Sequence, residues 1–199
     1  MRSRVLLASL LLVPMLGGCF PRLAHYEDSP APPADGVEFA FEPERGSVPV
    51  ERVVAFALTI NPGLRPDEAR RQASAMVARA AQHKVPTHLL VSLIATESAF
   101  NPLARSPVGA QGLGQLMPAT AREMGVRDPF DVEENIDGTA RYLAWLAGFW
   151  RQHPQRWELV LASYLAGVGT VSRQQKAGQP FTREQVSYIN RIFRLSGRV

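Results

Sequence analysis

From about residue 50 onward, apolar side chains recur at the spacing of α-helices. Four residues at positions i, i+4, i+7 and i+11 share one face of such a helix: Ala69, Ala73, Met76 and Ala80. The segment just before them reads Pro-Asp-Glu over residues 66–68, a typical first turn, because proline fits that position and acidic residues suit a helix N-terminus. The pattern predicts an amphipathic helix whose small residues lie against a core.

Three further segments repeat this spacing. Their apolar faces are formed, in turn, by Ile136, Ala140, Leu143, Ala147 and Trp150, by Trp157, Val160, Leu161 and Tyr164, and by Val186, Ile189 and Phe193. The second segment is expected to end at Gly167 and Gly169, and Thr182 with Gln185 predicts a capping box before the third. Neither strand alternation nor an internal repeat is evident. The sequence therefore predicts an all-α domain over residues 50–199.

The first 18 residues have the layout of a secretory signal peptide. Arg2 and Arg4 precede an apolar run over residues 5–16 that is too short to span a bilayer as a mature helix. Residues 16–19 read Leu-Gly-Gly-Cys and resemble the lipobox of bacterial lipoproteins, which implies cleavage before Cys19 and its acylation. The alternative is an ordinary signal peptide with an incidental cysteine. Because Cys19 is the only cysteine, an intramolecular disulfide and a Cys-rich metal site are excluded.

Residues 19–49 are predicted to form a tether between this anchor and the helical domain. Six of the 16 prolines lie here, and no apolar period is sustained. A plain N-terminal extension with no spacing role is the alternative. By resemblance to lipoprotein sorting rules, Phe20 after the cysteine favours a periplasm-facing position on the outer membrane over the inner membrane. Without Arg2 and Arg4 the net charge falls from +4 to +2, and the dispersed basic residues argue against a nucleic-acid partner.

One predicted helix carries a carboxylate where its pattern requires an apolar residue. The segment 86–98 opens at Pro86, and its apolar stripe of Leu90, Leu93 and Ile94 leads directly to Glu97. The opposite side carries His88, Ser92 and Thr96. Desolvation would raise the pKa of Glu97, as a general acid working near neutral pH requires. The alternative is a helix-end glutamate that reaches solvent.

The residues that follow Glu97 form a series of short motifs. They are Glu-Ser-Ala-Phe-Asn-Pro at 97–102, Ala-Arg-Ser-Pro-Val-Gly-Ala at 104–110, Gly-Leu-Gly-Gln-Leu-Met-Pro at 112–118, Thr-Ala at 120–121, Gly125, Asp-Pro at 128–129, Asn-Ile at 135–136, Gly138, Tyr-Leu at 142–143, Ala-Ser-Tyr at 162–164, Ala-Gly at 166–167 and Tyr188. In this order the motifs resemble the catalytic domain of the soluble lytic transglycosylase family, goose-type-lysozyme-like enzymes that cleave peptidoglycan. The resemblance covers about residues 84–193 and implies a lysozyme-like helical fold.

The resemblance implies a role for each matching residue. Glu97 matches the catalytic acid. Contacts with the glycan are implied for Ser106, Gln115, Met117, Tyr164 and Tyr188. On its own, Met117 is equally suited to filling a core. Asn135 is expected to hold a loop, and the glycines at 109, 112 and 114 either let the backbone approach a sugar or make a tight connection between helices.

A single carboxylate suffices for the reaction that the resemblance implies. Most glycosidases use two, whereas the next acidic residue after Glu97 is Glu123, and the acids within 128–137 are expected to form a solvated loop and helix start. Glu97 would protonate the oxygen between N-acetylmuramic acid and N-acetylglucosamine and then accept the proton of the muramyl C6 hydroxyl, giving a 1,6-anhydro end. No metal or cofactor is expected, because the four histidines are scattered.

Two positions depart from the pattern of the family. Leu165 stands where asparagine is usual, and Gly114 stands where methionine is usual. Because Glu97, Ser106, Gln115 and Tyr164 are retained, activity is predicted, with the two departures altering substrate preference. Two alternatives remain open: a lysozyme-type hydrolase that releases reducing ends, and a non-catalytic peptidoglycan-binding lipoprotein. A desolvated Glu97 would argue against the second, since a binding protein gains nothing from it.

Overall fold

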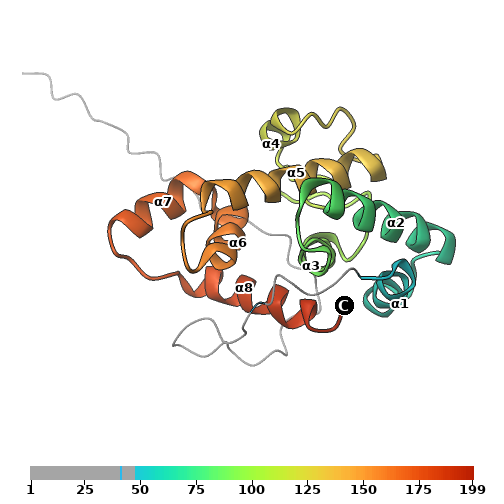
Figure 1. Ribbon diagram of the computed structural model, residues 1–199. Helices are drawn as coiled ribbons and strands as arrows, with labels where there is room; N and C mark the ends of the chain where they lie inside the picture. The colour runs from blue at the N-terminus through green and yellow to red at the C-terminus, as the bar shows by residue number, and fades with distance from the viewer. Residues whose placement is uncertain (1–40, 42–47) are drawn as a thin grey trace, which may run out of the picture.

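The computed structural model describes residue 41 and residues 48–199, which form α-helices joined by loops, the longest of them between α3 and α4 (Figure 1). The helices are α1 (Val50–Ile60), α2 (Pro66–His83), α3 (Thr87–Ser98), α4 (Pro118–Glu123), α5 (Val132–Phe149), α6 (Arg156–Ala166), α7 (Val168–Lys176) and α8 (Arg183–Ser196). Within this described part, β-structure is limited to two isolated bridges, from Gln111 to Arg105 and to Leu116. The all-α prediction is confirmed. The predicted signal peptide, Cys19 and nearly all of the tether lie outside the described residues.

Helix α3 runs through the centre of the domain and is enclosed by α1, α2, α5 and α8 (Figure 1). Its residues from 88 to 95 are all buried. The side expected to be opposite the apolar stripe does not face solvent: His88 is 2% exposed and Ser92 is fully buried. Ser92 meets its hydrogen-bonding need by donating to the carbonyl of His88 at 2.7 Å. The central position of α3 explains why a carboxylate on it is desolvated.

The helix starts and faces predicted from local patterns are confirmed. Helix α2 begins at Pro66, and the four residues of its small-residue face are fully buried. At the start of α8, the Thr182 side chain accepts from the amide of Gln185 at 3.2 Å, while the Gln185 side chain accepts from the amide of Thr182 at 2.8 Å. This reciprocal pair is the predicted capping box, and it fixes where the C-terminal helix begins.

One predicted helix end is wrong in part. Helix α6 does stop at Gly167, which has a φ of +83°, but α7 begins at the very next residue. Gly169, expected to end a helix, therefore lies inside α7. The sharp change of direction at Gly167 lets two helices follow each other without a loop. None of the helices in the described segments is both long and apolar enough to cross a membrane.

Two described residues before α1, Phe41 and Val48, pack against the domain. Phe41 lies among aromatic rings from three helices, with centroid distances of 5.0 Å to Phe193, 5.1 Å to His88 and 5.6 Å to Trp157. Val48 is 8% exposed and joins the same core. The segment expected to act as a tether therefore contacts the helical domain at Phe41 and again at Val48.

Candidate active site

Glu97 lies in the last turn of α3, where the chain turns sharply away from the helix. The two residues after the helix, Ala99 and Phe100, have φ values of +49° and +61°, which only glycine adopts without cost. Their carbonyls are held by side chains of neighbouring helices: Asn61 donates to Ala99 at 3.0 Å and Gln72 donates to Phe100 at 3.3 Å. Because these contacts fix the end of α3, they also fix the position of Glu97.

The side chain of Glu97 is desolvated, as its place on the apolar stripe predicted. The residue is 5% exposed, and burial raises the pKa of its carboxyl to about 7. Two weaker effects act in the opposite direction: a hydrogen bond donated by the hydroxyl of Tyr188 and the positive charge of Arg191. A carboxyl of this kind exchanges its proton near neutral pH, as an acid–base catalyst must.

Two tyrosines surround the carboxyl. Tyr188 extends from α8 and is 7% exposed, and Tyr164 comes from α6. The hydroxyl of Tyr164 donates to the carbonyl of Gly114 at 2.7 Å, which ties α6 to the loop between α3 and α4. Burial, reinforced by the charge of Glu97, raises the pKa of both hydroxyls well above the ordinary value. Both therefore remain neutral hydrogen-bond donors wherever Glu97 titrates.

The loop from 101 to 117 contributes Ser106, Gln115 and Met117. Ser106 is 8% exposed and its hydroxyl accepts from the amide of Ala110 at 2.9 Å. The amide nitrogen of Gln115 donates within the loop, to Gly112 at 2.9 Å and to Ala104 at 3.1 Å. Its buried Oε1 has no hydrogen-bond partner among the described residues. Met117, at 44% exposure, is not a core residue.

Asn135 of α5 holds this loop in place, as predicted. Its side chain accepts from the amide of Gly114 at 2.7 Å and donates to Pro129 at 2.8 Å and to Gln111 at 3.2 Å. Two of these contacts fix the loop relative to the long helix, and the third, to Pro129, holds the segment between α4 and α5.

The glycines at 112 and 114 serve the packing of the loop on α5. A Cβ atom at Gly112 would lie 2.0 Å from the carbonyl oxygen of Pro129, and one at Gly114 would lie 2.0 Å from Oγ1 of Thr139. Of the two readings of these glycines, the tight connection is the one this packing supports. The space taken by Thr139 also explains why no larger side chain stands at position 114. Leu165, the other departure, is partly buried against the core.

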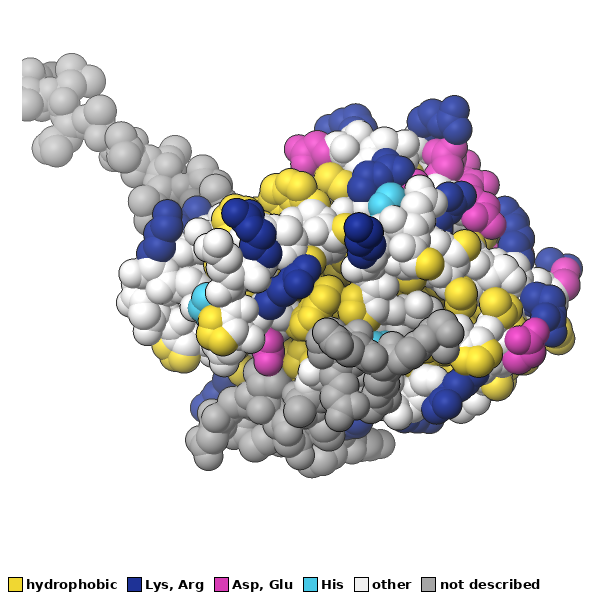
Figure 2. Space-filling model, viewed as in Figure 1, with side chains coloured by type: hydrophobic (Ala, Val, Ile, Leu, Met, Phe, Trp, Pro, Cys, Tyr) yellow, Lys and Arg dark blue, Asp and Glu magenta, His cyan; other side chains and the backbone are white. Residues whose placement is uncertain are grey.

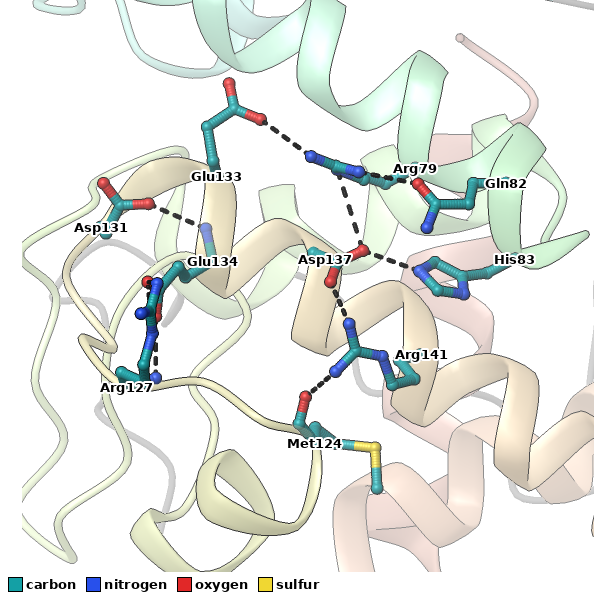
Figure 3. A network of polar contacts seen from close by, with 10 residues as sticks. All are labelled: Arg79, Gln82, His83, Met124, Arg127, Asp131, Glu133, Glu134, Asp137 and Arg141. Carbon is teal, nitrogen blue, oxygen red and sulfur yellow. Dashed lines mark hydrogen bonds and ion pairs between the residues drawn. The ribbon is translucent and has the colours of Figure 1, made fainter.

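The acidic residues near the start of α5 lie in a partly exposed loop and helix start, as predicted, and they also form ion pairs and a cap (Figure 3). Asp131 caps α5 by accepting from the amide of Glu134 at 2.8 Å. The carboxylate of Glu134 accepts from the backbone amides of Asp128 and Arg127 and from the side chain of Arg127, and these hydrogen bonds lower its pKa to about 2. Asp137 contacts Nε2 of His83 at 2.7 Å and also pairs with Arg141. These contacts join α2, the loop after α4 and α5.

The structure thus brings Glu97, Tyr164 and Tyr188 together, with Ser106 and Gln115 on the adjoining loop. Arg191, one turn after Tyr188 on α8, was missed by sequence reasoning. Its spacing of three residues from Tyr188 is the signal that could have placed it on the same helix face. In the portion of the chain that the structure describes, no group of three or more His, Cys, Asp or Glu could hold a metal ion.

The chain is similar in sequence to known proteins. The family model described as "Transglycosylase SLT domain" matches residues 74–186. Over 92 residues the chain is 42% identical to "Membrane-bound lytic murein transglycosylase F 2" of Alkalilimnicola ehrlichii, covering 45% of this chain and 20% of that protein. Over 66 residues it is 46% identical to the "Transglycosylase" of Enterobacteria phage PRD1, covering 33% of this chain and 25% of the phage protein. The chain thus matches at most a quarter of the length of these two relatives.

Two solved structures share the fold. The 70 kDa soluble lytic transglycosylase SLT70 of Escherichia coli superposes with a TM-score of 0.58 at 22% identity, over 73% of this chain and 28% of that one. Lytic transglycosylase Slt of Pseudomonas aeruginosa, solved as an inactive mutant with glutamine in place of a glutamate, superposes with a TM-score of 0.55 at 25% identity, over 62% of this chain and 23% of that one. The predicted lysozyme-like transglycosylase fold is confirmed.

Proposed function

Because the chain belongs to the transglycosylase SLT domain family, we propose that it is a peptidoglycan lytic transglycosylase. The proposed substrate bond is the β-1,4 linkage from N-acetylmuramic acid to N-acetylglucosamine, and the proposed product carries a 1,6-anhydro muramyl end. The observation that carries the proposal is the burial of Glu97, which raises the pKa of its carboxyl to about 7 beside the hydroxyl of Tyr188. A protein that only bound glycans would gain nothing from this costly arrangement.

In the first step, the protonated carboxyl of Glu97 donates its proton to the oxygen of the scissile bond. The bond between this oxygen and the muramyl anomeric carbon breaks, and its electron pair leaves with the oxygen, which becomes the 4-hydroxyl of N-acetylglucosamine. The N-acetyl group of the muramyl residue assists at the anomeric carbon. A pKa near 7 supports this step, because an ordinary carboxyl with a pKa of 4.5 would hold almost no proton at neutral pH.

In the second step, the carboxylate of Glu97 accepts the proton of the muramyl C6 hydroxyl. The C6 oxygen forms a bond to the anomeric carbon, and the carboxyl regains its starting protonation state without consuming water. An intramolecular nucleophile of this kind has a high effective concentration, so a second carboxylate to activate water is not required. Between the two steps, the hydroxyl of Tyr188 stabilises the Glu97 carboxylate by donating a hydrogen bond to it.

Four other residues are proposed to hold the glycan: Ser106, Gln115, Met117 and Tyr164. The free Oε1 of Gln115 suits an N–H or O–H of a sugar substituent. The exposed side chain of Met117 suits an apolar sugar face. The hydroxyl of Tyr164 donates to the loop carbonyl of Gly114, and the same side chain lies close enough to Glu97 to feel its charge.

The proposed test is digestion of purified peptidoglycan sacculi, with the released fragments analysed by mass spectrometry. Fragments with anhydro ends should appear with the wild-type chain and vanish with Glu97→Gln. Fragments with reducing ends would instead identify a lysozyme-type hydrolase. Sacculi that bind the chain and stay intact would identify a non-catalytic peptidoglycan-binding protein.

We also propose that the chain is a lipoprotein anchored through Cys19, on the periplasmic side of the outer membrane. The support is the pattern of a basic start, a short apolar run and Leu-Gly-Gly-Cys at residues 16–19. More than one acyl chain on this cysteine would give stable anchoring, which a single chain does not. Growth with a labelled fatty acid should label the wild-type chain in the outer-membrane fraction and leave Cys19→Ala unlabelled. Equal labelling of the two would refute the anchor.

A further inference from the structure

A row of aromatic side chains runs along the outer side of α5. Tyr142 and Trp145 are nearly parallel, with a ring centroid distance of 6.0 Å and an interplanar angle of 16°. Trp145 and Phe149 follow at 6.1 Å. Trp145 is 49% exposed and Phe149 is 50% exposed, which is unusual for side chains of this size. Figure 2 shows hydrophobic side chains gathered along the upper edge of the molecule, over α5 and beside α4.

This aromatic row is continuous with the candidate active site. Its inner member, Tyr142, contacts Tyr164 with a ring centroid distance of 5.2 Å. Tyr164 lies near enough to Glu97 for the charge of the Glu97 carboxylate to raise the pKa of the Tyr164 hydroxyl. Exposure increases outward, from the buried Glu97, through the partly buried Tyr164 and Tyr142, to the half-exposed Trp145 and Phe149. Aromatic side chains in contact with one another therefore connect the surroundings of Glu97 with the outer surface, where an extended ligand bound at Glu97 can reach them.

Gly148 adds a second observation that concerns the same surface. It is exposed within α5, three residues after Trp145 and directly before Phe149. A Cβ atom added there would meet nothing within 4 Å, so packing does not require glycine. Gly148 is the last residue but one of α5, where glycine costs less than the roughly 1 kcal/mol of a helix interior. The missing side chain leaves the surface beside the two exposed rings open.

We propose that Tyr142, Trp145 and Phe149 form an outer glycan-binding platform that holds a part of the peptidoglycan strand distant from the scissile bond. A pyranose ring has an apolar face of C–H groups, which can bury against an aromatic ring and is attracted to its electron-rich face. The hydroxyls at the edge of the sugar stay in solvent. The eight residues from Tyr142 to Phe149 span about 10 Å of helix, enough for more than one sugar ring in line.

This inference rests on the proposed function, because it concerns the same polymeric substrate. Its test uses the full chain carrying Glu97→Gln, so that a bound strand is not consumed, and two probes. The first probe is long peptidoglycan strands freed of their stem peptides, and the second is a tetrasaccharide of the same repeat. Dissociation constants are measured for this background and for the same background carrying Trp145→Leu, Trp145→Phe or Gly148→Gln.

Trp145→Leu should weaken binding of the long strands by roughly fivefold to tenfold and leave tetrasaccharide binding unchanged. Trp145→Phe keeps a ring and should retain most of the affinity. Gly148→Gln should also weaken binding of long strands by covering the platform, although it improves the helix, which separates binding from stability.

Three results would overturn the inference. Equal affinity of Trp145→Leu and Trp145→Phe for long strands would refute the platform while leaving the proposed function intact. Failure of the Glu97→Gln background to bind either probe would count against the proposed function itself, and the platform would fall with it. A Trp145-dependent affinity for phosphatidylethanolamine–phosphatidylglycerol vesicles, with strand binding unchanged, would identify a lipid-facing surface instead.

Discussion

The replacement Glu97→Gln should abolish activity and, at neutral pH, make the protein more stable. Glutamine has nearly the shape of the protonated glutamic acid, and its side-chain oxygen can still accept the hydrogen bond from Tyr188. The replacement therefore removes the cost of ionising a buried carboxyl and preserves its packing. A gain in stability on removing a catalytic group is expected where a site holds a group in an unfavourable environment.

The size of the gain follows from the pKa of Glu97. Burial raises this pKa from 4.5 to about 7, so the folded state binds the proton more tightly than the unfolded state does. Below pH 4.5 both states are protonated and no penalty exists. As pH rises from 4.5 to 7, the wild type should lose stability relative to the glutamine variant by about 1.4 kcal/mol per pH unit. The loss should level off above pH 7 at about 3 kcal/mol.

The assay is urea unfolding of the full-length wild type and the Glu97→Gln variant at intervals between pH 4 and pH 9. The quantity compared is the difference between their free energies of unfolding at each pH. Glu184→Gln is a matched control, because Glu184 is an exposed glutamate in the first turn of α8. This control should follow the pH dependence of the wild type. A difference between wild type and Glu97→Gln that is constant from pH 4 to pH 9 would refute the argument from burial.

Three further perturbations probe the surroundings of Glu97. Tyr188→Phe removes a hydrogen bond that lowers the pKa of Glu97, so the alkaline limb of the pH–activity profile should move to higher pH; an unmoved limb would contradict this role. Gly114→Ala should lower the free energy of urea unfolding by about 1–3 kcal/mol, with partial recovery on adding Thr139→Ala; additive effects would disprove the contact. Asn135→Ala should lower the free energy of urea unfolding by about 2–4 kcal/mol. A decrease below about 1 kcal/mol would show that other residues hold the loop.

Features encoded within one or two helical turns could be predicted from the sequence. The buried face of α2, the capping box at Thr182 and the loop-holding role of Asn135 all follow from residues or motifs that act locally or match a known pattern. The burial of Glu97 could also be predicted, because its position on the stripe of α3 depends only on helical periodicity.

Features that depend on long-range packing could not be predicted in this way. Helical periodicity treats α3 as having two sides, whereas its central position buries His88 and Ser92 as well as the apolar stripe. The sequence of the loop alone does not show which neighbour each glycine will contact. Gly114 contacts Thr139 because α5 packs against the loop there. The hydrogen bond between Tyr188 and Glu97 joins residues 91 positions apart, a pairing that no local rule contains.

The position of Glu97 at the end of α3 supports the proposal that this single carboxyl acts as both acid and base. Burial disfavours its charged form, and so does the negative end of the helix dipole, since Glu97 lies one residue before the last residue of α3. Tyr188 and Arg191 favour the charged form and limit the rise of its pKa. Without these two the carboxyl would hold its proton too tightly to give it to a glycosidic oxygen. Without burial the carboxyl would be ionised at neutral pH and would have no proton to give.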